Sequence, residues 1–135
     1  MRPVPVFVDS SVWIDHFRDV QGPRPEALRD LLRDDAVLLG DLVLMEVLQG
    51  FTADRLFEQA EEELALLPLV QVGGRELAVA AASNYRFLRT KGVTVRKSID
   101  MLIGTWCIVN RTPLLHSDRD FDALEEHLGL PVWRG

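Results

Sequence analysis

Five short apolar runs alternate along the chain with longer segments in which apolar residues recur at helical spacing, and this alternation most constrains the fold. The runs are residues 4–8, 36–40, 69–72, 113–116 and 131–133. Short apolar runs bounded by proline, glycine or polar residues are typical of buried strands. Strands that are separated by helices pair in parallel and are covered on both faces. We therefore predict an α/β fold of three layers, in which helices flank a central, mostly parallel sheet.

The segments between these runs are predicted to form helices. Their expected ranges are residues 10–17, 25–34, 41–50, 52–67, 74–92, 98–110 and 117–129. The first strand is expected to be bounded by Pro3 and Asp9. We find no internal repeat, low-complexity segment or linker, so we expect residues 1–135 to form a single domain, which is long enough to bury a hydrophobic core.

The composition excludes several classes of protein. A chain with 47% hydrophobic and 27% charged residues is expected to fold rather than to remain disordered. The net charge of −6 argues against a general nucleic-acid coat protein, but it permits an enzyme with a local basic surface beside an acidic pocket. The N-terminus is unlike a signal peptide and no apolar stretch approaches the ~20 residues of a membrane span, so we expect a soluble, cytoplasmic protein. The single cysteine, Cys107, excludes an internal disulfide and is expected to be a packed thiol.

Four carboxylates lie where the predicted fold could bring them together. Asp9 directly follows the first strand and Asp118 follows the strand at 113–116, and the carboxyl ends of parallel strands are where such sheets bind ligands. Glu46 and Asp100 lie on unusually apolar helices that could reach the same edge. Clustered carboxylates repel each other unless a cation lies between them, and hard divalent cations prefer oxygen ligands. Such a site suits phosphodiester hydrolysis, because it requires neither histidine nor a nucleophilic serine.

Each of these acids also has a structural interpretation. Asp9 could be the N-cap of the helix that follows it. Asp100 could complement the dipole of its helix, with Ser98 as N-cap. Glu46 could reach solvent beside Gln49.

The acids near the last predicted helix leave further alternatives. Ser117 and Asp120 have the spacing of a capping box, although aspartate replaces the usual glutamate or glutamine, so Asp118 could belong to a helix cap. Asp120 and Asp122 are expected to be solvated or to support Asp118.

The segments "VFVDSSVWID", "LMEVLQG", "SIDMLIGTWCI" and "HSDRDF" resemble, in order and spacing, the four acidic motifs of PIN-domain ribonucleases, in particular the VapC-type toxins of bacterial toxin–antitoxin pairs. The resemblance covers essentially the whole chain. It implies that Asp9, Glu46, Asp100 and Asp118 are the catalytic, metal-binding acids and that Mg²⁺ or Mn²⁺ is the cofactor. It also implies an auxiliary role for Ser11, whose position often carries a hydroxyl near the metal water in this family.

The chain departs from the family near the fourth motif. Many members carry threonine or serine two residues before the acid, and this chain has His116 there, with Ser117 adjacent to Asp118. Asp120 or Asp122 could therefore contribute to the site in place of Asp118.

The resemblance further implies an endoribonuclease, a hydrolase that cuts tRNA or ribosomal RNA at restricted sites and leaves a 5′-phosphate and a 3′-hydroxyl. It implies inhibition by a cognate VapB-type antitoxin, whose C-terminal segment occupies a groove beside the active site, and a homodimeric toxin. The helix expected at 10–17 carries Trp13, Ile14 and Phe17, which could line this groove or simply pack in the core.

Residues 84–99 form a basic segment within an acidic chain. They contain no acid and five cations, which are Arg86, Arg89, Lys91, Arg96 and Lys97. Because the segment leads into Asp100, we predict that Arg86, Arg89, Arg96 and Lys97 contact RNA phosphates. The alternative is a solubilising patch at a helix end, where cations also suit the dipole.

Other functions fit the sequence less well. The main alternative is a catalytically inactive PIN-fold module that only binds protein, but such a module has no need of all four acids. A phosphatase with an aspartyl nucleophile commonly has a second aspartate two residues after the first, where this chain has Ser11. A phosphotransfer receiver domain requires paired acids in the first loop and a later lysine, and neither arrangement is convincing here.

Overall fold

The computed structural model describes residues 4–135, so Pro3, the expected boundary of the first strand, lies outside the described residues. Four strands and seven helices follow one another in this part of the chain. Their bounds are β1 (Val6–Val8), α1 (Ser10–Phe17), α2 (Pro23–Arg33), β2 (Val37–Gly40), α3 (Asp41–Leu48), α4 (Asp54–Leu64), β3 (Leu69–Val70), α5 (Arg75–Thr90), α6 (Ser98–Val109), β4 (Leu114–Leu115) and α7 (Asp120–Leu128).

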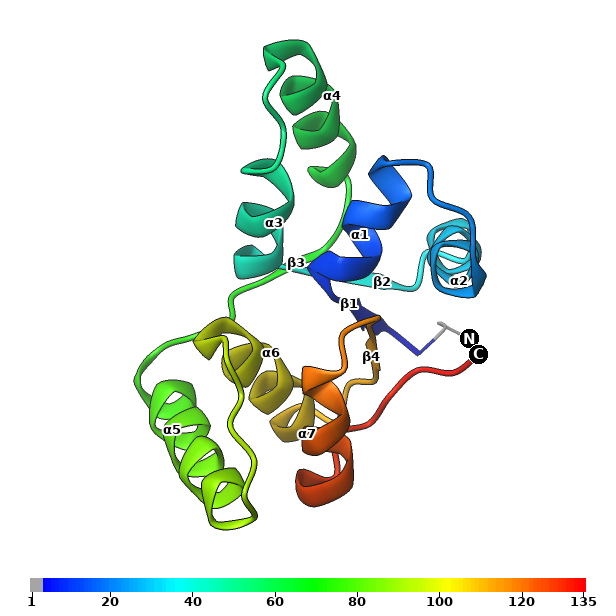
Figure 1. Ribbon diagram of the computed structural model, residues 1–135. Helices are drawn as coiled ribbons and strands as arrows, with labels where there is room; N and C mark the ends of the chain where they lie inside the picture. Colours follow the sequence, from blue (N-terminus) through cyan, green and yellow to red (C-terminus); the bar gives the residue numbers. More distant parts are fainter. Residues whose placement is uncertain (1–3) are drawn as a thin grey trace.

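The strands form one parallel sheet in the order β3–β2–β1–β4. Phe7 in the centre of β1 is in register with Leu38 on one side and Leu114 on the other. Helices α1 to α4 lie on one side of the sheet and α5 to α7 lie on the other (Figure 1). The prediction of a three-layer α/β fold is therefore confirmed.

The order of the strands determines where a site can form. From β1 the chain adds β2 and then β3 on one side, and it later returns to add β4 on the other side of β1. Ligands bind at such a switch point, because the connections leave the two neighbouring strands in opposite directions. The N–H of Asp9 donates to the carbonyl of Leu115 at 2.9 Å, so the carboxyl ends of β1 and β4 are joined directly.

Several predicted boundaries were wrong, and the contacts explain why. The helix expected at 25–34 begins earlier, at Pro23, because proline is well tolerated in a first turn. The expected strand at 131–133 is reduced to a single parallel bridge between Val132 and Leu114. The other predicted elements are present, but most are a few residues shorter.

Two predicted helix caps were also wrong. Lys97, not Ser98, is the N-cap of α6. The last helix begins at Asp120, and its predicted capping box does not form, because the N–H of Ser117 donates to the hydroxyl of Ser11 instead.

Helix α6 is buried on most sides, as its apolar sequence predicted. Its buried residues are Asp100, Met101, Ile103, Gly104, Thr105 and Cys107. A Cβ atom at Gly104 would overlap the side chain of Leu124, so glycine allows α7 to pack closely on α6. Cys107 is fully buried and burial raises the pKa of its thiol, which confirms the prediction of a packed cysteine. None of the helices described for residues 4–135 has the length and apolarity of a membrane span.

Candidate active site

Three carboxylates converge where the start of α6 meets the turn between β4 and α7. Asp100, Asp118 and Asp120 each place one carboxylate oxygen within 4.8 Å of the others. Asp100 is buried in the first turn of α6, and the other two are half-buried. The N–H of Asp120 donates to Oδ1 of Asp118 at 3.0 Å, which fixes the turn that carries both acids. Such a group of oxygens could hold a metal ion.

Asp9 contributes both a helix cap and a free oxygen. As the structural interpretation predicted, Asp9 is the N-cap of α1. Its Oδ2 accepts the Ser11 N–H at 3.1 Å and the Ser11 hydroxyl at 2.6 Å. Its Oδ1 is buried and has no hydrogen-bond partner in the described part of the chain, residues 4–135. Capping therefore uses only one of the two oxygens of this carboxylate.

Two adjacent serines at the start of α1 hold three acid-bearing segments together. The hydroxyl of Ser10 donates to Oε1 of Glu46 on α3 at 3.2 Å, so Glu46 is held in place rather than simply solvated. The hydroxyl of Ser11 donates to Asp9 and accepts the N–H of Ser117 at 3.2 Å. Sequence reasoning missed Ser10, although the two consecutive hydroxyls after the first acid were a usable signal, and it considered Ser117 only for a helix cap.

Burial raises the pKa values of Asp9, Glu46 and Asp100, and neighbouring acids add to this effect at Glu46 and Asp100. The pKa of Asp100 rises to about 7, mainly because the group is buried and then because the charges of Asp9 and Asp118 lie nearby. Burial and the charge of Asp9 likewise raise the pKa of Glu46, and burial raises that of Asp9. The positive charge of Lys97 opposes these effects at both Asp100 and Glu46. The site therefore concentrates negative charge that its own cations offset only in part.

His116 supports the fourth acid through the backbone. Its Nδ1 accepts the N–H of Asp118 at 3.2 Å, which assigns the proton of the neutral ring to Nε2. Burial is the main cause that lowers the pKa of His116, so the ring is neutral near pH 7. The histidine thus shapes the turn that carries Asp118.

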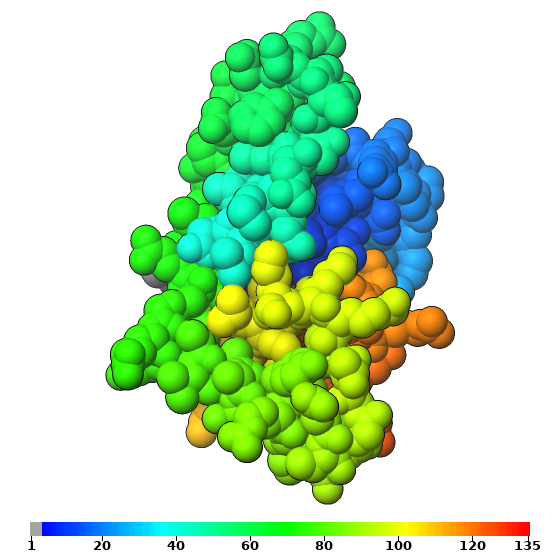
Figure 2. Space-filling view, turned by 60° about the vertical axis from the view of Figure 1, so that its left-hand side comes forward, coloured from blue at the N-terminus to red at the C-terminus, as the bar shows by residue number. Residues whose placement is uncertain are grey.

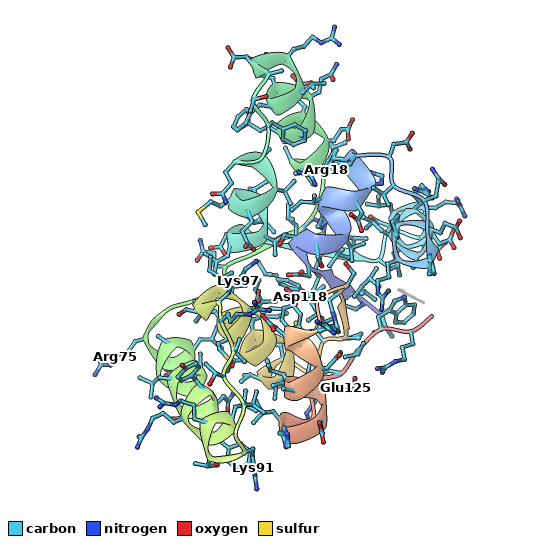
Figure 3. All side chains as sticks on the ribbon, viewed as in Figure 1. Arg18, Arg75, Lys91, Lys97, Asp118 and Glu125 are labelled. Carbon is cyan, nitrogen blue, oxygen red and sulfur yellow. The ribbon has the colours of Figure 1, made fainter. Side chains whose placement is uncertain are left out.

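The remaining predicted residues lie outside the group of three converging carboxylates. Asp122 is exposed in the first turn of α7 and is outside the group of three converging carboxylates. Arg86 and Arg89 are exposed on α5, and Arg96 and Lys97 are exposed in the link to α6. Figure 2 shows this link in yellow, between α3 above and α5 below, with the orange segment of β4 and α7 to its right. Figure 3 places Lys97 and Asp118 near the centre of the molecule.

The donor set fits a hard divalent cation such as Mg²⁺ or Mn²⁺. Oδ1 of Asp9 and Oδ2 of Asp100 are buried and have no hydrogen-bond partner within residues 4–135. A buried carboxylate oxygen without a partner is costly, and carboxylate oxygens are the ligands that these cations prefer. The site could thus bind a cation with oxygens that no residue of the described chain satisfies.

Comparisons with known proteins show the family to which the chain belongs. A family model described as PIN domain matches residues 6–126. Two curated relatives are VapC ribonuclease Mb1587 of Mycobacterium bovis and ribonuclease VapC11 of Mycobacterium tuberculosis. Each is 31% identical to this chain over 121 residues, which cover 88% of this chain and 90% of the relative.

Two solved structures share the fold. VapBC2 from Rickettsia felis, bound to a DNA fragment from its promoter, superposes with a TM-score of 0.74 at 14% identity, and the match covers 97% of this chain and 100% of the other. A toxin–antitoxin complex from Klebsiella pneumoniae superposes with a TM-score of 0.62 at 21% identity, covering 86% of this chain and 89% of the other.

The raised pKa of Asp100 predicts how the stability of the metal-free protein depends on pH. Because its pKa is about 7 in the folded protein and 3.8 in a model peptide, the folded state binds the proton more tightly. The bound proton therefore adds to the free energy of unfolding. Its contribution is fully present below the pKa of the unfolded chain and is lost as the pH rises through the pKa of the folded protein. The free energy of unfolding, measured in EDTA, should therefore fall between pH 4 and pH 7 by up to about 1.4 kcal/mol for each pH unit.

Denaturant unfolding of Asp100→Asn should show a shallower fall over the same pH range. The matched control is Asp34→Asn, since Asp34 is exposed after α2. The interpretation is wrong if Asp100→Asn retains the full wild-type slope.

Proposed function

Because this chain belongs to the PIN-domain family and its curated relatives are VapC ribonucleases, we propose that it is a metal-dependent endoribonuclease and the toxin of a toxin–antitoxin pair. The observation that carries this proposal is the pair of buried, unpartnered oxygens on Asp9 and Asp100 beside further carboxylates. A structural role alone does not account for these oxygens, because the helix cap uses only Oδ2 of Asp9. An inactive protein-binding module would not need them.

In this proposal the acids hold Mg²⁺ or Mn²⁺ and the surrounding residues keep them in place. The proposed ligands are Asp9, Glu46, Asp100 and Asp118, with Ser11, Asp120 and Asp122 as auxiliary candidates. A bound divalent cation lowers the pKa of water and neutralises charge on the phosphate that is cut. The two serines at the start of α1 position three of the acid-bearing segments, and His116 holds the backbone of Asp118.

The finer parts of the proposal rest on the family resemblance. We propose tRNA or ribosomal RNA as the substrate and the cytoplasm as the place of action. We also propose that residues 1–135 are one domain and that the toxin is a homodimer.

Replacing one acid tests metal binding and RNA cleavage in the same variant. Mg²⁺ or Mn²⁺ should raise the melting temperature of the wild type, because binding to the folded state alone stabilises it. Asp9→Asn and Asp100→Asn should reduce this rise and abolish RNA cleavage while the fold persists. Melting curves and cleavage of total RNA, each with and without EDTA, measure both effects.

Asp34→Asn is again the control and should behave as the wild type. Full RNase activity in Asp100→Asn would refute the assignment of the site. Absence of any EDTA-sensitive cleavage by the wild type would favour the protein-binding module.

A basic rim beside the acids is the proposed contact for the RNA backbone. Lys97 offsets part of the burial effect that raises the pKa values of Asp100 and Glu46, so its charge reaches both carboxylates. RNA phosphates that approach the negative pocket need such cations nearby. We propose Lys97 and Arg96 as the nearest contacts, with Arg86 and Arg89 farther along α5.

Replacing both Arg96 and Lys97 with alanine should weaken RNA binding and reduce its salt dependence. The logarithmic slope should fall by about 0.7 for each lost phosphate contact, as measured by fluorescence anisotropy at several salt concentrations. Stabilisation by Mg²⁺ should survive, since the carboxylates are intact. Arg75→Ala is the control, because Arg75 is an exposed cation in the first turn of α5 and points away from Lys97 and Asp118 (Figure 3). An unchanged slope in the double variant would mean that RNA approaches from another side.

A partly apolar groove between α1, α3 and α4 is the proposed site of the antitoxin. It has a volume of about 300 Å³, and its lining includes Ile14, Phe17, Arg18, Val47, Phe51 and Leu56. The rings of Phe17 and Phe51, which both line the groove, contact each other edge to face, with 5.6 Å between their centroids. Trp13 is buried in the core, so of the three residues considered from the sequence only Ile14 and Phe17 line the groove.

Co-expression with the product of the adjacent upstream gene should give a stable complex without RNase activity. Leu56→Asp should weaken that complex, because it places a charge in the groove, and the free variant should still cut RNA. Leu66→Asp is the control, since Leu66 is exposed and outside the groove. Purification of a free, fully active chain from the co-expression would count against this partner.

A further inference from the structure

A second cavity lies between α2, the end of β4 and the C-terminal segment. Its volume is about 440 Å³, which is within the range of ligand-binding pockets. Its lining includes Arg24, Glu26, Asp30, Leu115, Trp133 and Arg134. None of these residues belongs to the acidic site or to the groove described above.

One backbone hydrogen bond links the lining of the cavity to the first acid. Leu115 lines the cavity, and its carbonyl accepts the N–H of Asp9 at 2.9 Å. The C-terminal segment runs parallel to β4, because Val132 forms a parallel bridge with Leu114. The chain therefore delivers Trp133 and Arg134 to the same edge of the sheet as the carboxylates.

Trp133 is held firmly at this edge. Its N–H donates to the carbonyl of Leu114 at 2.9 Å. Arg134 forms a two-pronged ion pair with Glu125 on α7, with distances of 2.6 and 2.7 Å. The indole is half-buried, so it packs against the core and still contributes surface to the cavity.

Arg24 supplies a cation that is free to meet a ligand. Arg134 is paired with Glu125, and Asp30 is paired with Arg33 at 3.1 Å. Arg24 is exposed and forms no ion pair within residues 4–135. Glu26 also lines the cavity, in the first turn of α2, where an acid suits the helix dipole. A phosphate would therefore bind at Arg24, and an uncharged group would occupy the rest of the cavity.

Given that the chain is a ribonuclease, as proposed above, we propose that this cavity binds an unpaired nucleotide of the RNA that flanks the bond being cut. The base stacks on Trp133 and its phosphate binds Arg24. Proteins recognise unpaired RNA by combining aromatic platforms for bases with cations for the backbone. The acidic site and this cavity would then hold one strand at two places, which favours cleavage in loops over cleavage in helices.

Binding of fluorescein-labelled oligouridylates of increasing length, in EDTA to prevent cleavage, tests the subsite. Trp133→Ala should weaken the binding of the longer oligomers about fivefold or more, and Trp133→Phe should retain most of the affinity, since phenylalanine can still stack. Arg24→Ala should also weaken binding and lower the salt slope by about 0.7. The controls are Leu66→Ala and Arg75→Ala, an exposed apolar residue and an exposed cation that do not line the cavity.

The subsite is refuted if Trp133→Ala and Arg24→Ala bind as the wild type does, if the control variants lose as much affinity, or if the wild type does not bind the oligomers. Should circular dichroism show that Trp133→Ala does not fold, Arg24→Ala and Trp133→Phe decide the test. Cleavage of RNA with Mg²⁺ is measured separately. A wild type that binds oligouridylates through Trp133 but never cuts RNA would refute the ribonuclease and leave the binding site standing.

Discussion

Burial of neighbouring carboxylates is the constraint on which the rest of this structure depends. Asp9 and Asp100 are buried, and each leaves an oxygen without a hydrogen-bond partner among residues 4–135. Burial and then neighbouring negative charges raise the pKa of Asp100 to about 7, so the charged form of this carboxylate is disfavoured when no cation lies nearby. The proposed divalent cation would supply the missing charge and take up the free oxygens. This proposal accounts for oxygens that the helix cap at Asp9 leaves unused.

The fold maintains this arrangement through hydrogen bonds and close packing around the switch point of the sheet. The strand ends are joined at Asp9, and the hydroxyl of Ser11 connects that acid to the turn before α7. Gly104 lets α7 approach α6, which keeps the turn near Asp100. These contacts come from different segments of the chain. A substitution that breaks any one of them should therefore shift the positions of the carboxylates.

The sequence predicted the three layers and the edge of the sheet where the acids gather, because both follow from local patterns. Asp9 adjoins its strand in sequence, so its position at the carboxyl end needed no knowledge of the tertiary structure. The supporting contacts could not be predicted in this way. Ser10 meets Glu46 across 36 residues, and Ser11 meets Ser117 across 106. The closeness of Asp120 to Asp100 depends on one turn, and the cavity at Trp133 depends on how α2 packs against the C-terminal segment. The catalytic roles of the acids stay predictions.

The central claim is that these carboxylates bind a catalytic divalent cation, and anomalous diffraction from crystals grown with Mn²⁺ tests it most directly. The claim predicts a manganese peak in contact with the carboxylates of Asp9 and Asp100, at the edge where β1 and β4 end. Crystals that contain manganese only at other surfaces, with both of these carboxylates free of metal, would contradict it.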